Sequence, residues 1–228
     1  MVARRVGFGL FNRVTVRAFE EEPVAMKLLY SVSSPYVRKV IVAARELDIF
    51  EGLELIDGAT SPTATNRAVV EQNPLGKIPA LVLDDGRVLF DSRVIAEYFD
   101  TLAGGSRLFP AGQARWDAIT LQALADGMTD AALLARYEGF LRPEDKRWED
   151  WTAGQLGKIK ACLDRLEQDW AGYLSGGIDI GCIATGCALG YLDFRFPHLE
   201  WQRTHSELSA WFQEFGARPS MQATLPEG

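Results

Sequence analysis

Short apolar segments alternate with helical patterns over residues 26–104 of this chain, whereas the sequence after residue 112 carries only helical patterns. The short segments are rich in Leu and Val, have the length of strands, and lie near residues 27–30, 53–56, 80–83 and 87–90. Helical patterns fall between them and after the last one. The resulting order, β-α-β-α-β-β-α, predicts a small α/β unit whose first crossover is right-handed.

The second half is expected to be an all-α unit over residues 113–228, joined to the first by a glycine-rich linker. Its helical patterns cover residues 113–138, 144–173, 180–194 and 204–216. Apolar residues repeat every three or four positions between Leu156 and Trp170, which is the spacing of a helix face that packs into a core.

Composition excludes several classes of function. The chain has 228 residues and a net charge of −7, which argues against binding to nucleic acid, because that binding needs a basic face. No apolar run is long enough to span a bilayer, so no membrane partner is expected. The three cysteines form no CxxC pair and favour a reducing compartment, the cytoplasm. No metal is expected, since the two histidines are not spaced with the cysteines as a ligand set.

Residues 1–25 stand apart from the rest of the chain. They carry Arg4, Arg5, Arg13 and Arg17 before an acidic stretch, and their apolar part fits a secretory signal poorly. The Arg-rich part could mimic an organelle transit peptide. A start codon placed too early and a disordered tail are the preferred interpretations, because Met26 directly precedes the first predicted strand.

Two segments of the α/β half together suggest a site for one small ligand. In residues 73–81 (NPLGKIPAL), the step Ile78-Pro79 lies between a loop and a strand, where a cis proline would turn the Ile78 backbone outward to pair with an extended peptide. About ten residues later, Asp91-Ser92 would begin a helix, and the free N–H groups of a helix N-terminus suit a carboxylate.

These segments, with residues 33–40 (SSPYVRKV) and 186–195 (GCALGYLDFR), resemble the glutathione S-transferase family, in its cytosolic type and bacterial serine-type branch. The resemblance covers roughly residues 26–220. It implies a thioredoxin-like glutathione-binding domain, an all-helical domain and a homodimer. Where the family usually begins its core helix with a capping box, this chain has Asp179 and Cys182; Asp179 can still cap the helix, but Cys182 cannot return a comparable hydrogen bond.

The chemistry that the resemblance implies is ionisation of the glutathione thiol. A free thiol has a pKa of about 8.5, so the enzyme must stabilise the thiolate. Ser34 and Ser33 lie where the family places its catalytic residue, with Ser34 the preferred one. Whichever is not catalytic is expected only to cap the helix. A serine cannot form a mixed disulfide, so addition, substitution or isomerisation is favoured over disulfide reduction.

The resemblance also assigns the ligand contacts. Ile78 and Pro79 would hold the cysteinyl part of glutathione, Asp91 and Ser92 the γ-glutamyl end, and Lys77 the glycine carboxylate. A solvated loop charge is the alternative for Lys77, and a plain helix cap the alternative for Asp91. Asp126 is similar to an aspartate that some relatives offer to the glutamyl amine across the dimer interface.

The electrophile would lie between the two halves. Candidate residues for this acceptor pocket are Tyr36, Met128, Ala132, Arg136, Tyr137 and Phe140. Their composition suggests an apolar small molecule with a polar or anionic handle, in line with a role in detoxification. The alternatives are a non-catalytic regulatory or stress-response protein that kept the fold, and a glutathione-dependent peroxidase, isomerase or lyase that uses the same site.

Overall fold

A computed structural model describes residues 26–227 of the chain. The prediction for residues 1–25 lies outside this range. None of the helices within it combines the length and the apolar character needed to cross a membrane.

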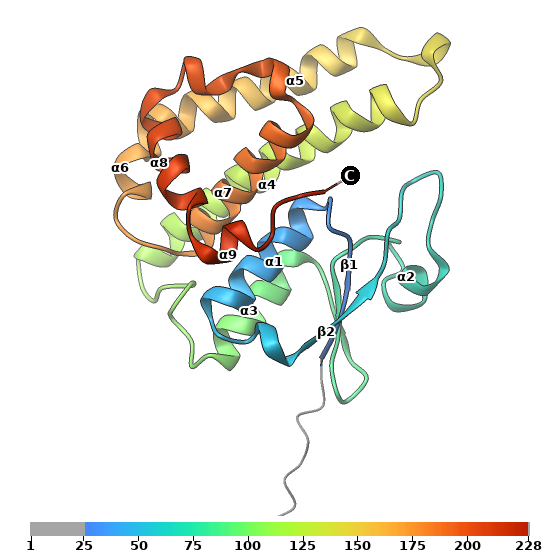
Figure 1. Ribbon diagram of the computed structural model, residues 1–228, viewed down its shortest axis with the longest axis vertical. Coiled ribbons are helices and arrows are strands. Elements are labelled where there is room, and N and C mark those ends of the chain that lie inside the picture. Colours follow the sequence, from blue (N-terminus) through green and yellow to red (C-terminus); the bar gives the residue numbers. More distant parts are fainter. Residues whose placement is uncertain (1–25, 228) are drawn as a thin grey trace, which may run out of the picture.

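The α/β half is built on a four-stranded sheet, as predicted (Figure 1). Its strands are β1 (Met26–Tyr30), β2 (Leu53–Asp57), β3 (Ala80–Val82) and β4 (Val88–Leu89). The order across the sheet is β2-β1-β3-β4, with β1 and β2 parallel and the other pairs antiparallel. Leu28 pairs with Leu55 on one side and with Leu81 on the other, so β1 is an interior strand.

Helices cover both faces of this sheet. They are α1 (Pro35–Glu46), α2 (Arg67–Gln72) and α3 (Ser92–Leu102), and a single 3₁₀ turn, Phe50–Gly52, precedes β2. Because successive side chains of a strand point to opposite faces, Leu28 packs in the main core with α1 and α3, while Leu29 packs with Val69 of α2. Of residues 62–72, only Arg67–Gln72 is helical, as α2.

The helical half begins with the long helix α4 (Ala114–Phe140). The helices that follow are α5 (Glu149–Arg165), α6 (Ala171–Leu174), α7 (Ile180–Arg195), α8 (Ser206–Gly216) and α9 (Pro219–Gln222), with 3₁₀ turns at Glu144–Lys146, Pro197–Leu199 and Trp201–Arg203. The single helix predicted over residues 144–173 is wrong. In the structure, this segment is divided by a π-helical turn, Leu166–Trp170. The prediction missed the turn because a three-four apolar spacing does not distinguish an α turn from a π turn.

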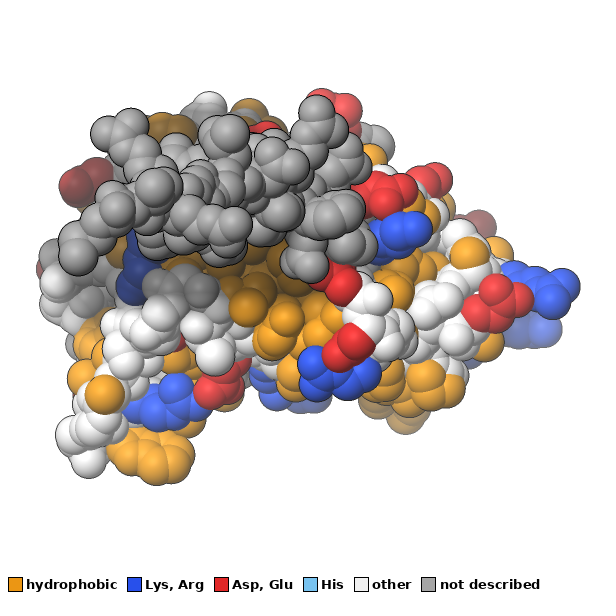
Figure 2. Space-filling model, turned by 90° about the horizontal axis from the view of Figure 1, so that it is seen from below, with side chains coloured by type: hydrophobic (Ala, Val, Ile, Leu, Met, Phe, Trp, Pro, Cys, Tyr) orange, Lys and Arg blue, Asp and Glu red, His pale blue; other side chains and the backbone are white. Residues whose placement is uncertain are grey.

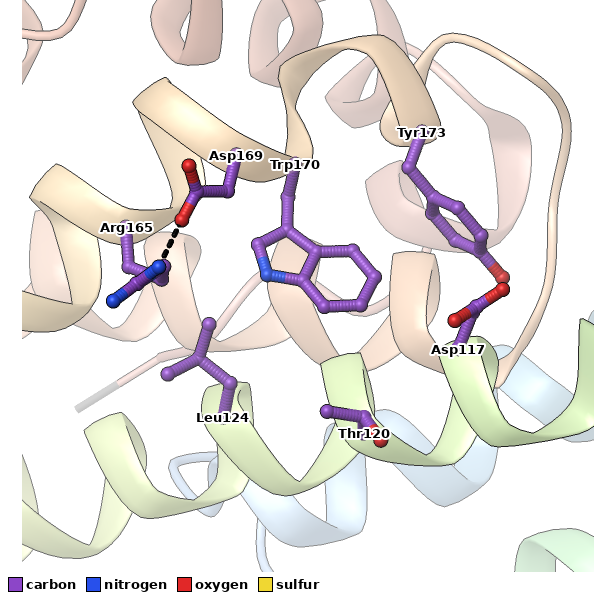
Figure 3. Close-up of a pocket in the computed structure, with 7 residues that line it drawn as sticks. All are labelled: Asp117, Thr120, Leu124, Arg165, Asp169, Trp170 and Tyr173. Carbon is purple, nitrogen blue, oxygen red and sulfur yellow. Dashed lines mark hydrogen bonds and ion pairs between the residues drawn. The ribbon is translucent and has the colours of Figure 1, made fainter.

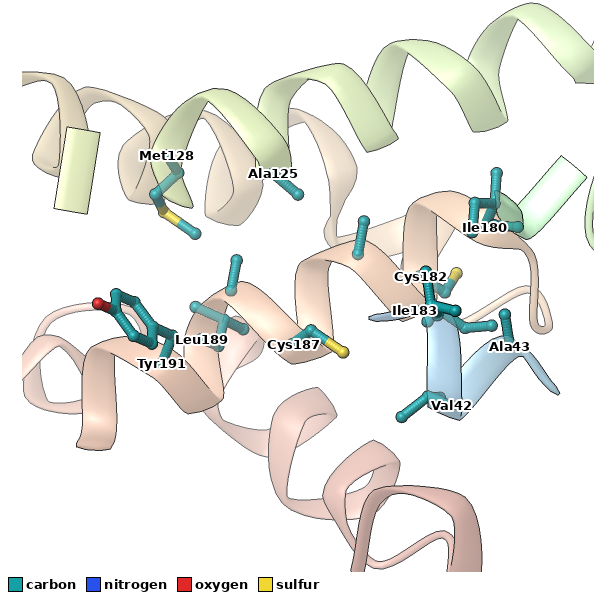
Figure 4. Close-up of a cluster of buried hydrophobic side chains, with 14 of the residues drawn as sticks. Val42, Ala43, Ala125, Met128, Ile180, Cys182, Ile183, Cys187, Leu189 and Tyr191 are labelled. Atoms are coloured by element: carbon teal, nitrogen blue, oxygen red, sulfur yellow. The ribbon is translucent and has the colours of Figure 1, made fainter. Parts of the chain in front are cut away.

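Helix α7 is the centre of the core (Figure 4). Every residue from Ile180 to Leu192 is buried, as expected for a helix that is apolar on all sides. Its start lies against α4, where a Cβ at Gly181 would come within 2.8 Å of the Ala118 carbonyl oxygen. Met128 and Tyr191 lie together further along the two helices, so α4 and α7 run in the same direction.

Charged side chains of both signs are scattered among apolar ones on the face shown in Figure 2. Large apolar residues that are exposed include Val94 and Leu102 on α3 and Trp116 at the start of α4. These residues belong to adjacent helices, since Arg115 of α4 pairs with Glu97 of α3.

Candidate functional site

The two serines lie at the start of α1, at the junction of the two halves. Ser34 is the N-cap of this helix, and its Oγ accepts a hydrogen bond from the Val37 N–H at 3.3 Å. Ser33 lies one residue earlier, with its Oγ 3.4 Å from the Ser31 Oγ. Both serines are half-buried. Capping uses only a lone pair of the Ser34 oxygen, so its hydroxyl proton is available to another acceptor.

The peptide bond between Ile78 and Pro79 is cis, as predicted from the sequence. The loop before it is organised by Asn73, whose side chain is buried. Its amide donates to the Lys77 carbonyl at 2.8 Å and accepts from the Leu75 N–H at 3.1 Å. Sequence analysis gave Asn73 no role, although an Asn-Pro pair at the start of a loop is typical of such a turn. The Lys77 side chain is exposed.

Asp91 and Ser92 begin α3, as the sequence predicted. Asp91 is the N-cap residue, and its Oδ1 accepts from the Arg93 N–H at 3.0 Å. The capping role that was the alternative for Asp91 is therefore present. Ser92 is only 3 % exposed, so its hydroxyl lies beneath the surface at the positive end of the helix.

The structure places Asp126 differently from the expectation. It is 4 % exposed and lies inside a single chain, where Lys39 of α1 donates to it at 2.7 and 2.9 Å and Arg93 of α3 donates at 2.7 Å. Both carboxylate oxygens are therefore occupied by cations of the same chain. Asp126 joins α1, α3 and α4, and we do not retain it as a ligand of glutathione across an interface.

The expected acceptor residues divide into three groups. Met128 and Ala132 were wrongly expected to line a pocket, because both are fully buried in the core. The Tyr36 hydroxyl donates to Asp130 of α4, and burial together with this bond raises the pKa of Tyr36 well above its usual value. Tyr36 therefore attaches α1 to α4.

The remaining candidates lie with two residues of α7 that sequence analysis did not single out. Tyr137 is half-buried, and Phe140 is exposed with the Arg136 guanidinium 4.6 Å from its ring centre. Burial and the charge of Arg136 lower the pKa of Arg195, so these two guanidinium groups act on one another. Burial also raises the pKa of Tyr191, against the effect of both arginines. The ends of α4 and α7 thus bring two cations and two phenols together.

A narrow hollow, too small to admit a water molecule, lies beside the serines. Its lining residues are Val32, Ser33, Ser34, Pro35, Arg38, Cys187, Tyr191 and Pro226. A larger cavity of about 600 Å³ lies in the helical half and is lined by residues of α4, α5, α6 and the π-helical turn (Figure 3). None of the predicted site residues lines the larger cavity.

The cysteines are unsuited to act as nucleophiles at neutral pH. Burial raises the pKa of Cys182 to about 12 and that of Cys187 to about 11. Burial also raises the pKa of the half-buried Cys162. These thiols stay protonated and pack as small apolar groups.

Comparison with known proteins identifies the family to which this chain belongs. Residues 33–102 match the pattern described as "Glutathione S-transferase, N-terminal domain", and residues 149–214 match "Glutathione S-transferase, C-terminal domain". The chain is 34% identical over 209 residues to the uncharacterized GST-like protein YibF of Escherichia coli K12, covering 88% of this chain and 98% of that protein. The chain therefore belongs to the glutathione S-transferase family.

Two crystal structures extend the comparison. A glutathione transferase family member from Pseudomonas fluorescens Pf-5 with bound glutathione is 48% identical and has a TM-score of 0.88, covering 90% of this chain and 100% of that one. A family member from the same organism with bound S-(propanoic acid)-glutathione is 47% identical with a TM-score of 0.83, covering 89% and 100%.

Proposed function

We propose that this protein is a glutathione transferase in which Ser34 stabilises the thiolate of reduced glutathione for attack on a small electrophile. The observation that carries the proposal is the Ser34 Oγ at the start of α1, bonded to the Val37 N–H with its own proton unused by that bond. The binding of glutathione by the related Pseudomonas protein supports the same site here.

Two effects would lower the pKa of the bound thiol. The positive end of α1 favours a negative charge, and the Ser34 hydroxyl donates a hydrogen bond to the sulfur. One such preorganised donor contributes about 2.7–4 kcal/mol to transition-state stabilisation in enzymes where it has been removed. Ser33, one residue earlier, is the rival donor, although its Oγ already faces Ser31.

The rest of the ligand would be held by the α/β half. Ile78, before the cis proline, pairs with the cysteinyl backbone of the ligand, and Ser92 at the start of α3 receives the γ-glutamyl carboxylate. Asp91 beside it faces the γ-glutamyl amine while it caps the helix. Lys77 is exposed and close enough in the chain to pair with the glycine carboxylate.

The electrophile would be a small molecule that carries a carboxylate. Arg136 and Arg195 concentrate positive charge at the ends of α4 and α7, and Tyr191 connects this region with the hollow beside the serines. The S-(propanoic acid)-glutathione bound by the relative is a glutathione thioether with such a group. In a substitution, the sulfur attacks the carbon that bears a halide, the C–S bond forms, and the halide leaves with the electron pair of the broken bond.

We propose that the protein works as a homodimer in the reducing cytoplasm, where glutathione is kept in its thiol form. The exposed Val94, Leu102 and Trp116 supply an apolar surface on α3 and α4 for a second copy. Sedimentation of the purified protein tests this, and a monomer at micromolar concentration would contradict it.

Titration calorimetry with reduced glutathione is the first experiment, with Ser92→Ala beside the parent. Binding that weakens in the variant supports the site, and absence of binding in both would overturn the proposed function. Ultraviolet absorbance of the bound thiolate then compares Ser34→Ala with Ser33→Ala. If only Ser33→Ala loses the thiolate signal, the catalytic assignment moves to Ser33.

Paired electrophiles test the substrate class. Bromoacetate and bromoacetamide have nearly the same size, but only the first carries a charge. After correction for the uncatalysed rates, Arg136→Gln should lower kcat/KM for the acid by about tenfold, the value of one charged hydrogen bond, and leave the amide within about twofold. An equal loss for both would show that Arg136 only packs against Phe140.

A further inference from the structure

The larger cavity of the helical half lies apart from the proposed glutathione site. Its volume of about 600 Å³ falls within the roughly 300–1,000 Å³ of ordinary ligand pockets. The lining residues are Asp117, Thr120, Leu124, Arg165, Asp169, Trp170 and Tyr173. Along α4, Thr120 of the cavity and Arg136 of the electrophile region are about 24 Å apart, at 1.5 Å per residue. The cavity is therefore a second, separate candidate site.

Trp170 and Tyr173 form an aromatic wall of the cavity opposite α4 (Figure 3). Their rings meet edge to face with the centres 5.3 Å apart, an arrangement that aromatic pairs prefer. The Tyr173 hydroxyl donates to Asp179, which fixes the far end of that ring. Trp170 is half-buried and points toward α4. The face of an indole ring attracts a cation more strongly than the face of any other aromatic side chain.

The π-helical turn Leu166–Trp170 holds the aromatic wall in place. Its Glu167 accepts from the N–H groups of Glu207 and Leu208 on α8, at 3.1 and 2.8 Å. Arg165 at the end of α5 pairs with Asp169 of the same turn. The wall is thus fixed before any ligand enters, which lowers the cost of ordering it on binding. Such turns are rare and are frequent at functional sites.

Asp117 gives the cavity a negative charge that no cation of the lining balances. Arg165 is paired with Asp169, and no hydrogen bond or ion pair reaches Asp117 from the residues that the structure describes. Burial raises the pKa of Tyr173 most, and the carboxylates of Asp179 and Asp117 raise it further, so Asp117 acts on the aromatic wall. The net charge of −7 on the whole chain also attracts cations.

We propose that this cavity binds a small organic cation, in which an ammonium group is carried by an aromatic or other apolar body. The ammonium group would lie over the Trp170 ring on the side of Asp117, and the apolar body would pack against Leu124. An anion would be repelled by Asp117, and an uncharged molecule would gain nothing from it. The proposal does not rest on the proposed function, because no residue assigned to glutathione or the electrophile lines this cavity.

Titration of the full chain with phenethylamine, followed by NMR spectroscopy, tests the site. The indole N–H signal of Trp170 is identified by its loss in Trp170→Phe, and its shift reports binding in the cavity. Phenethyl alcohol is the uncharged probe of the same shape. The amine should shift the signal saturably, with an affinity at least about fivefold higher than that of the alcohol, the size of a partly solvated charge pair. A shift that does not saturate, or equal affinities, would overturn the proposal.

Carboxylate variants assign the charge to Asp117. Asp117→Asn keeps the shape of the side chain and should lower the amine-to-alcohol ratio of affinities by about fivefold. Asp150→Asn is the matched control, since Asp150 is an exposed aspartate in the first turn of α5, outside the cavity. It changes the net charge equally and should leave the ratio unchanged. If both variants leave the ratio as it is in the parent, or lower it equally, Asp117 is not the counter-ion and the proposal fails.

Discussion

Helices α1 and α7 pack against one another, yet they are held in place by different forces. Each begins with a polar N-cap, Ser34 in α1 and Asp179 in α7. Both oxygens of the Asp179 carboxylate have partners in the chain: one accepts from the Cys182 N–H at 2.9 Å and the other from the Tyr173 hydroxyl. Ser34 instead borders a narrow hollow between the two halves. One cap has both of its oxygens bonded, while the other keeps a hydroxyl proton that the capping bond does not use.

The two helices also differ along their length. From Ile180 to Leu192, α7 is buried and almost entirely apolar, so its position is set by how its side chains fit against the surrounding core. Helix α1 carries the buried cations Arg38 and Lys39, and Glu46 near its end. Because these groups form directional bonds to α4, α9 and the residues that follow α9, the place and rotation of α1 are set by bonds as well as by packing. The comparison suggests that orientation matters most for the helix that carries the proposed catalytic group.

The largest effect on stability should come from removing the buried cation of α1. Lys39→Met leaves Asp126 in the core with only Arg93, and should lower the free energy of unfolding by about 3–5 kcal/mol in urea denaturation. Arg93→Gln is the control, because Arg93 is half exposed and its loss should cost about 1 kcal/mol or less. Equal losses would show that the burial of the pair is not what matters.

Removal of the Ser34 cap should affect catalysis more than folding. Ser34→Ala should lower kcat/KM by about 10²–10³-fold, the loss seen when one preorganised donor is removed. The free energy of unfolding should fall by only about 1 kcal/mol, the usual value of an N-cap. Steady-state kinetics and urea denaturation of the same preparation measure the two effects. A variant that loses stability but keeps its turnover would make Ser34 a cap like Asp179.

Removal of the Asp179 cap should affect folding more than catalysis. Asp179→Ala takes away the acceptor for the Cys182 N–H and the Tyr173 hydroxyl, and should lower the free energy of unfolding by about 1–2 kcal/mol. For a chain of this size, each kcal/mol lowers Tm by about 2–4 °C. Calorimetry should detect the shift while kcat/KM at a temperature below unfolding stays unchanged. Lost activity in a folded variant would contradict the separation of roles.

The smallest effect concerns the end of α1. Glu46 accepts from Arg218 at 3.0 and 2.7 Å. Burial would raise the pKa of Glu46, but the bonds from Arg218 and Ser220 outweigh burial and lower it. A carboxyl group with a lowered pKa stabilises the fold above its unfolded pKa, and this stabilisation is lost as the pH falls through the folded pKa.

Glu46→Gln should therefore lower the free energy of unfolding by about 1 kcal/mol at neutral pH. The difference from the parent should shrink as the pH falls below about 4, the region in which glutamate titrates. Urea denaturation at several pH values measures it, with the exposed Glu51→Gln as control. A difference that does not depend on pH would mean that the substituted amide destabilises the fold through packing instead of charge.

Much of the fold and part of the site followed from the sequence, because they depend on neighbouring residues. The strand order and the cis Ile78-Pro79 bond were predicted, the cap Asp179 was expected, and capping was the alternative role given to Asp91. The cap of α1 is Ser34, the serine preferred as catalytic, although the capping role was expected of whichever serine is not catalytic. Each is a local property: a cap and its partner are two or three residues apart. Which serine donates a hydrogen bond to the glutathione sulfur remains a prediction, since both serines lie at the same end of α1.

Long-range contacts were decided only by the tertiary structure. Asp126 meets Lys39 across 87 positions of the chain, and Arg38 meets Met221 across 183. Met128 and Ala132 are core residues, and Met128 lies against α7 (Figure 4), which no periodicity within α4 could indicate. A helical pattern shows which face of a helix is apolar, but the partner of a given side chain depends on how distant helices cross. The sequence therefore determined most of the elements, and packing determined which charged side chains pair across them.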